Sequence, residues 1–222
     1  MIATEEQQSI RDAARSFALE QLAPRAALWD REHMFPANVL AEMGQLGFLG
    51  MGVPPEWDGA GTDYVSYAMA VMEIAGGCGA ISTIMSVHNG VGCMPILSFG
   101  TSEQKDRFLK PMARGEQIGC FCLTEPEAGS DAASIRTRAR RDGDSYGHIA
   151  IVFAVTDPSA SKKGISAFIV PTDTPGFVVA RTEEKMGQHA SDTCQLTFKD
   201  MRVPLSQRLG EEGEGLNRAS KP

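Results

Sequence analysis

The sequence predicts an α+β protein of two domains, a helical domain over residues 1–115 and a β domain over residues 116–222. Three observations support this fold class. Apolar residues recur at near-helical spacing in the first half, the period changes near Gly115, and short β runs separated by turn residues follow. A block of helices followed by a block of strands is typical of α+β folds rather than of alternating βαβ units.

The first two helices are marked by their ends. Thr4, followed by two glutamates, is typical of a helix start, and Pro36 opens a second helix that ends at Gly44 and Gly47. The apolar residues predicted to line the buried face of the first helix are Ile10, Ala14, Phe17, Leu22 and Trp29.

Two more capped helices follow a Gly/Pro-rich loop at Gly50–Gly61. Thr62 and Asp63 cap a long helix that is apolar nearly all round, which predicts burial between other helices. Thr101 precedes acidic residues in the first turn of another helix. The β runs expected beyond Gly115 are Ile149–Val155, Ile165–Val170, Phe177–Ala180 and Cys194–Phe198.

Composition limits the class of protein. The 222 residues are 42% hydrophobic and 22% charged, as in an ordinary globular protein with a sizeable core. The net charge of −7 disfavours nucleic acid as a partner, and the arginines within 136–141 alternate as on the wet face of a strand. The amino terminus resembles neither a secretory nor a transit peptide, and we expect no apolar run long enough to cross a membrane. A cytoplasmic location is predicted.

Cysteine and histidine give no sign of a metal site. The five cysteines include no Cys-x-x-Cys pair, and Cys120 and Cys122 are too close for the usual structural zinc spacing. Reduced, mostly buried thiols are expected. The four histidines are scattered, so each is predicted to be a surface residue or a satisfied core residue. Motifs of a serine hydrolase elbow, a Rossmann turn and a phosphate loop are missing from the sequence.

One stretch suggests a ligand site. Cys120-Phe-Cys-Leu-Thr-Glu-Pro-Glu-Ala-Gly-Ser-Asp131 is a short apolar run that breaks into small and hydroxyl residues. Phe121 and Leu123 can enter a core as a strand, and Thr124, Gly129 and Ser130 then offer hydroxyls and accessible amides to a phosphate or a planar ring. The alternative is a strand that runs into an ordinary turn.

Several blocks of the sequence resemble the acyl-CoA dehydrogenase family of flavoproteins, of the short-chain or butyryl type. They follow one another in the family's order, and the resemblance runs from about Thr4 to Ala219. The blocks are Leu123-Thr-Glu-Pro-Glu-Ala-Gly-Ser-Asp131, Lys185-Met-Gly-Gln-His-Ala-Ser-Asp-Thr193, Phe198-Lys-Asp-Met-Arg-Val-Pro204 and Gly210-Glu-Glu-Gly-Glu-Gly215.

The resemblance implies a helical amino-terminal domain, a middle β-barrel domain and FAD as the cofactor. It places Phe121, Cys122, Leu123, Thr124, Gly129 and Ser130 at the flavin. Ser130 would also lie near the acyl-CoA thioester, and Ser161 is a candidate for the coenzyme A end, with a solvated turn as the alternative. The stretch Ile84–Gly92 resembles the region near the family's acyl pocket, with ordinary helix packing as an equal alternative.

Two departures from the family are expected to matter. The chain passes from Asp142-Gly-Asp144 to Ile149 without the family's return strand and aromatic-Ile-Thr motif, although the pattern alone predicts a β-hairpin of Ser134–Arg141 with Tyr146–Val155. The resemblance stops near Ala219, so we expect this chain to be truncated, without the carboxy-terminal helical bundle that carries the catalytic glutamate. No catalytic residue is therefore assigned.

The resemblance implies α,β-desaturation of acyl-CoA thioesters, a role in fatty acid metabolism and an electron-transfer flavoprotein as acceptor. The family's homotetramer is doubtful without the bundle. Two alternatives stay open: an inactive family fragment that acts as a binding module, and a sibling such as an acyl-CoA oxidase or a nitroalkane-type flavoprotein. We expect a large exposed apolar surface in either case.

Overall fold

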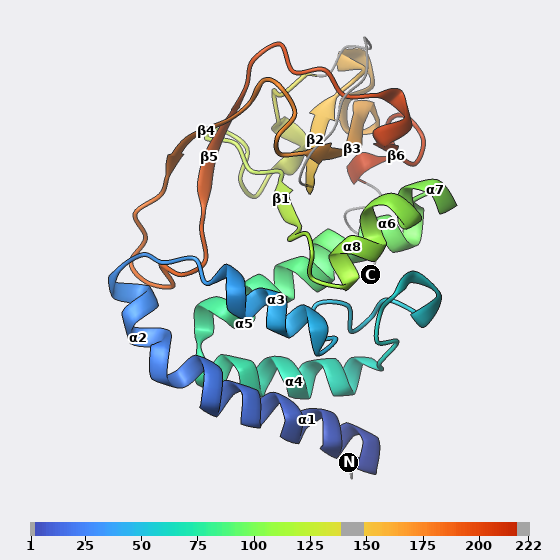
Figure 1. Cartoon of the computed structure of the whole chain (residues 1–222). Coiled ribbons are helices and arrows are strands. Elements are labelled where there is room, and N and C mark those ends of the chain that lie inside the picture. The colour runs from blue at the N-terminus through green and yellow to red at the C-terminus, as the bar shows by residue number, and fades with distance from the viewer. Residues whose placement is uncertain (1–2, 139–148, 217–222) are drawn as a thin grey trace.

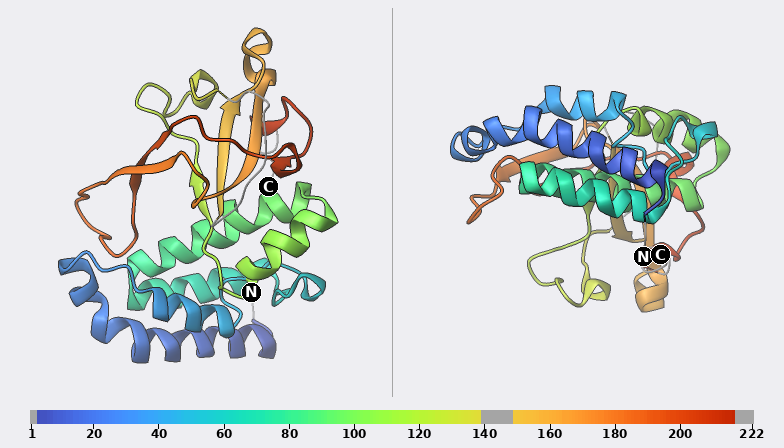
Figure 2. Two further views of the ribbon diagram at one scale, coloured as in Figure 1. Left: turned by 45° about the horizontal axis from the view of Figure 1, so that its top comes forward. Right: turned by 90° about the horizontal axis from the view of Figure 1, so that it is seen from below.

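The computed structural model describes residues 3–138 and 149–216. Helices occupy the first part of the chain and strands the second, as the sequence predicts (Figure 1). The helices of the first part of the chain end at Ala113 and the first strand begins at Cys120, while the domain bounds 1–115 and 116–222 stay predictions. The helices lie side by side as a layer, and β2 and β3 stand on one side of it (Figure 2).

The first helical run is longer than its start signal indicates. α1 (Glu5–Phe17) begins at Thr4, whose hydroxyl accepts the Gln7 N–H while the Gln7 side chain accepts the Thr4 N–H, a complete capping box. A π-helical turn, Ala18–Leu22, joins it to α2 (Ala23–Arg31). The wider turn explains why Phe17 and Leu22, five positions apart, are both buried.

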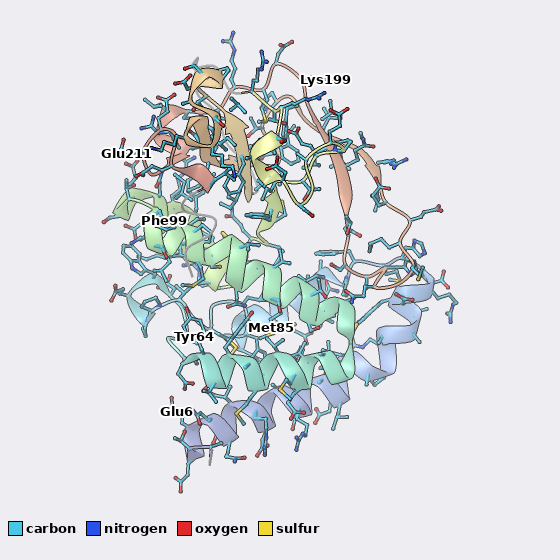
Figure 3. The ribbon with its side chains drawn as sticks, turned by 180° about the vertical axis from the view of Figure 1, so that it is seen from behind. Glu6, Tyr64, Met85, Phe99, Lys199 and Glu211 are labelled. Atoms are coloured by element: carbon cyan, nitrogen blue, oxygen red, sulfur yellow. The ribbon has the colours of Figure 1, made fainter. Side chains whose placement is uncertain are left out.

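The next helices form the core of the first domain. α3 (Ala37–Gln45) starts after Pro36 as predicted, and α4 (Tyr64–Gly77) is capped by Asp63, whose carboxylate accepts the N–H groups of Val65 and Ser66. These bonds lower the pKa of Asp63 to about 2, the bonds from Ser66 contributing most. Buried residues of the first helices and α5 (Gly79–Val87) make one apolar cluster, and Met85 lies inside it (Figure 3).

One prediction for α4 is wrong in part. The helix packs against both α1 and α5, as its apolar pattern predicts, but one of its faces stays exposed. Tyr64 is 74% exposed and Met72 72% exposed. Figure 3 shows Tyr64 at the outer end of the helix. Periodicity indicates which faces of α4 are apolar, but it does not specify which of those faces a neighbouring element covers.

The prediction about membrane-spanning length is also wrong. In the part of the chain that the structure describes, α5, a π-helical turn (His88–Cys93) and α6 (Met94–Phe99) join into one helical run, Gly79–Phe99. Its 21 residues and a mean hydropathy of 1.2 suffice to cross a membrane by length and composition. Because 56% of it is buried inside the protein, it has the pattern of a core helix.

The remaining helical segments bring the chain to the strands. α7 (Ser102–Gln104) begins with a capping box made by Thr101 and Gln104, and it continues through a π-helical turn to α8 (Lys110–Ala113). The Gln104 amide also donates to the carbonyls of Ser206 and Arg208, 2.7 and 3.1 Å away. This side chain therefore ties a helix to the edge of the β domain.

The strands form a four-stranded and a two-stranded sheet, matching the abridged β domain that the sequence predicts. The larger sheet has the order β1-β2-β3-β6, with β1 parallel to β2 and the other pairs antiparallel. β4 and β5 pair separately, with an irregularity between Val179 and Arg181. The strands are β1 (Cys120–Cys122), β2 (Ile149–Val155), β3 (Ile165–Pro171), β4 (Phe177–Thr182), β5 (Cys194–Phe198) and β6 (Arg208–Leu209).

The hairpin predicted from Ser134 to Val155 is wrong in the residues that the structure describes. Arg138 pairs with Val155 in a parallel bridge, and the Val155 N–H donates to the Thr137 carbonyl at 2.7 Å. A hairpin would make this pairing antiparallel. The predicted Asp142-Gly143 turn and the departure at Ser145–His148 lie outside the described residues.

The loop between β4 and β5 reaches the helical domain, where Ala190 is buried in the helical core. The His189 N–H donates to Asp30 at 2.8 Å, and the rings of His189 and His33 stack with centroids 4.1 Å apart. The Thr83 hydroxyl bonds to the Gln188 amide at 2.7 Å. The two domains are therefore joined at this loop as well as at Gln104.

Candidate functional site

The candidate site begins with β1, whose side chains are used in packing. The ring of Phe121 meets that of Phe153 nearly edge-on, with centroids 5.3 Å apart, and joins the cluster next to α6 and α8. Cys120 and Cys122 face the opposite side of the sheet, against Val152 and its neighbours. What β1 can offer a ligand is therefore the backbone at its end, where Leu123 and Thr124 follow.

Glu125 holds the loop after β1 in shape. Its two carboxylate oxygens accept the N–H groups of Arg136 and Thr137 at 2.7 and 2.8 Å, and its backbone pairs with Ala128 in a tight turn. Partial burial alone would raise the pKa of this carboxyl, but the hydrogen bonds from Thr137 and Arg136 outweigh it and the pKa is lowered. Ala128 and Ile135 are buried beneath the turn, so the loop is fixed from both ends.

The predicted ligand-binding groups of this loop are exposed. Thr124, Gly129 and Ser130 face solvent, and no residue in 3–138 or 149–216 forms a hydrogen bond with the hydroxyls of Thr124 or Ser130. A Cβ built on Gly129 would meet nothing within 4 Å. The loop thus presents hydroxyls that have no hydrogen-bond partner among the described residues, and open space beside Gly129, which fits a phosphate or a flavin ring placed against its backbone.

Ser161 lies on a different loop, the 3-10 segment Pro158–Gly164, and it is exposed. Its backbone is left-handed, with φ 51° and ψ −128°, which is strained for a residue with a side chain. The pKa of Asp131 is lowered, first by the hydrogen bond from Ser134 and more weakly by the charge of Lys162. The loop of Ser161 is therefore an electrostatic neighbour of the loop of Ser130.

Possible metal ligands, cysteines and surface hollows add little to the candidate site. Among the described residues no cluster of His, Cys, Asp and Glu has the geometry of a metal site. The five cysteines all lie among the described residues and form no disulfide there: Cys78 and Cys93 are buried, Cys120 and Cys122 half-buried, and Cys194 is exposed. Two hollows lined by described residues, one beside Glu42 and one beside Arg114, lie in the helical domain away from β1.

Two residues that support the site had no clear signal in the sequence. Glu125 carries no local signal of its role, because its partners come eleven and twelve positions later. His88 was expected only to be a satisfied core or surface residue, and it proves to be a buried acceptor for the Gly119 N–H beside β1. The one sequence feature that could have marked it is that His88 is the single titratable residue in the mostly apolar stretch 84–92.

Family models match the chain over nearly all of this structure. The model described as acyl-CoA dehydrogenase, N-terminal domain, matches residues 4–116, and the middle-domain model matches residues 120–201. The chain belongs to the acyl-CoA dehydrogenase family. The fold class predicted from the sequence is therefore confirmed, with the amino-terminal helical and middle domains in that order.

Individual relatives support the same family assignment. The mitochondrial short-chain specific acyl-CoA dehydrogenase of Rattus norvegicus is 44% identical over 95% of this chain and 55% of its own length. A chain of the electron transferring flavoprotein structure from Acidaminococcus fermentans superimposes with a TM-score of 0.94 at 39% identity, over 99% of this chain and 61% of that one. An acyl-CoA dehydrogenase complexed with FAD from Bacillus anthracis gives 0.89 at 32% identity, over 98% and 39%.

The chain thus spans a little over half the length of the curated acyl-CoA dehydrogenases that it matches. The roles of individual residues at the loop are taken up below as proposals.

The first test of the site concerns Glu125. Glu125→Ala removes two hydrogen bonds, so we expect the Arg136 and Thr137 amides to exchange faster and stability to fall by about 1 kcal/mol. Glu127→Ala is the matched control, because among the described residues this exposed neighbour makes a surface ion pair with Arg136, and its loss should change stability by less than about 0.5 kcal/mol. Denaturant unfolding and amide exchange measure both. Equal behaviour of the two variants would contradict the structural role of Glu125.

Proposed function

We propose that this chain forms one wall of a FAD site in an acyl-CoA dehydrogenase-type oxidoreductase. The observation that carries the proposal is the loop after β1, where Thr124, Gly129 and Ser130 are exposed and without described hydrogen bonds while Glu125 holds their backbone in place. An exposed polar loop whose backbone conformation is held by hydrogen bonds is the arrangement that a preorganised ligand site requires.

Each residue of the loop has a proposed part. The Leu123 backbone and the Thr124 hydroxyl would donate to the polar edge of the flavin ring, where they stabilise negative charge. The amides beside Gly129 and the Ser130 hydroxyl would bind the diphosphate, since the missing Cβ leaves room for close approach. Phe121 and Cys122 support the wall from within the sheet. FAD, when bound, supplies the hydride acceptor.

The substrate proposed is an acyl-CoA, with Ser130 and Ser161 on its side of the wall. The proposed reaction is α,β-desaturation, with an electron-transfer flavoprotein as the acceptor, and the family resemblance and the relatives' names support it. Glu125 is a poor candidate for the base, because both of its oxygens already accept backbone N–H groups and its pKa is lowered. No base is assigned in this chain, and cytoplasmic location and a homotetramer stay predictions.

A binding role without catalysis is the second candidate. The exposed apolar side chains of Tyr64 and Met72 on α4 favour it, because a surface of this kind is typical of an interaction site. Flavin binding separates the two candidates. The speed with which reduced flavin reacts with oxygen would then separate a dehydrogenase from an oxidase.

The decisive experiment is a titration with FAD, followed by flavin fluorescence and by the shape of the absorbance band. We expect saturable binding, and we expect Gly129→Ala to weaken it about tenfold, or about 1.4 kcal/mol, because the added methyl group takes space intended for the cofactor. Gly187→Ala is the control: a Cβ there also meets nothing within 4 Å, but it lies in the loop between β4 and β5. Absence of FAD binding by the unaltered chain would overturn the proposal.

A further inference from the structure

His88 is a buried titratable residue that lies outside the candidate loop. It begins the π-helical turn in the middle of the run Gly79–Phe99, and it is 0% exposed. A polar ring in such a place is costly unless its nitrogens are paired, so its partners indicate what it does.

Both ring nitrogens of His88 are paired with backbone groups. Nδ1 lies 3.0 Å from the Gly119 nitrogen and Nε2 lies 3.1 Å from the Met112 carbonyl oxygen. An N–H group can only donate and a carbonyl can only accept, so Nδ1 carries no hydrogen and Nε2 carries one. The ring is therefore a neutral bridge between the end of α8 and the start of β1.

The surroundings keep His88 neutral and chemically inert. Burial lowers its pKa to about 4, and protonation would also turn Nδ1 into a donor facing the Gly119 N–H. Cys93 Sγ lies 3.5 Å from Nε2, but complete burial raises the pKa of this thiol, so no thiolate forms near neutral pH. A Cys–His nucleophile is therefore excluded, and a positioning role is what the geometry supports.

The Gly119 backbone lies close to side-chain and backbone atoms of the helical domain. A Cβ at this position would lie 2.5 Å from the Met112 side chain and 3.2 Å from the Gly92 Cα. The backbone is thus pressed against the helical run on one side and bonded to His88 at its N–H. β1 starts at the next residue, Cys120, and pairs in parallel with β2. The position of the Gly119 backbone therefore helps to set the position of β1 and of the loop that follows it.

We infer that His88 is a positioning residue for the candidate flavin wall: by accepting the Gly119 N–H, it sets the place from which β1 carries Leu123 and Thr124 to the cofactor. The inference rests on the proposed function, since it names the part of the helical domain that holds the same wall. Leu123 and Thr124 follow Gly119 by four and five residues, which is about 13–17 Å along an extended strand. Because this segment is short and extended, a shift of Gly119 would also shift Leu123 and Thr124.

Two amide variants test this inference. The amide of His88→Asn stands near the position of Nδ1 and can still accept the Gly119 N–H, whereas the amide of His88→Gln extends toward Nε2 and the Met112 carbonyl. Both are neutral and both leave one buried partner unpaired, so a merely structural role predicts equal effects. We expect FAD to bind His88→Asn about as tightly as the unaltered chain and His88→Gln at least about tenfold more weakly.

Amide hydrogen exchange gives a readout that does not need FAD. We expect faster exchange from Gly119 to Leu123 in His88→Gln and near-unaltered exchange in His88→Asn. Equal FAD affinity and equal exchange in the two variants would overturn the inference. If the unaltered chain binds no FAD, the proposed function fails, and the difference in exchange still decides the role of His88. If His88→Gln does not fold, the unaltered chain decides: a Gly119 amide that exchanges as fast as exposed loop amides overturns the inference.

Discussion

Met85→Ala is expected to lower the free energy of unfolding by about 2–5 kcal/mol. Met85 is 0% exposed and lies on α5 within the cluster that also contains Leu49, Ile74 and Ile81. Truncation removes buried methylene and thioether contacts and leaves a cavity that rigid helices cannot fill. Urea unfolding followed by circular dichroism measures the change.

Met72→Ala is the matched control for this experiment. Met72 is on the neighbouring helix α4 and is 72% exposed, so we expect a change within about 0.5 kcal/mol. A large loss for Met72→Ala would mean that the exposed face of α4 is covered in solution, and a small loss for Met85→Ala would contradict the core described here.

Stability is expected to fall by about 2 kcal/mol between pH 7 and pH 5 because of His88. Its pKa is about 4 in the folded protein and 6.5 in the unfolded chain. Between these values the unfolded chain binds a proton that the folded protein does not, so acid favours unfolding. The stabilisation by neutral His88 is fully present above pH 6.5 and is lost as the pH falls toward 4. The total loss of stability at pH 4 is about 3 kcal/mol.

The His88→Asn variant isolates this effect, since asparagine does not titrate. We expect its stability to be nearly flat from pH 7 to pH 5. Carboxylates with a lowered pKa, such as Asp63 and Glu125, lose their contribution only below their ordinary pKa values of 3.8 and 4.5, which lie outside this window. The same slope in both proteins would assign the pH dependence to other groups.

The elements with local signals could be predicted from the sequence. Thr4, Asp63 and Thr101 each cap a helix within three residues of themselves, and that information is contained in the sequence itself. The four β runs are correct to within two residues because turn clusters bound them. The family blocks likewise indicated both domains in the right order.

Features that depend on distant partners could not be predicted. The π-helical turn at Ala18–Leu22 and the open side of α4 are decided by what packs against each helix. At the candidate site, the loop residues were indicated by pattern, but their support was not. His88 meets Gly119 across 31 positions, and no local rule connects an imidazole in an apolar helix with the start of a strand.

The burial of Ala190 has a consequence for the order in which this chain can fold. This residue belongs to the helical core, yet it lies in the loop between β4 and β5, which is synthesised long after α8. A nascent chain that has emerged only as far as Ala113 still lacks a member of the core that its helices enclose. We expect the amino-terminal helices to finish closing only when the β4–β5 loop reaches them.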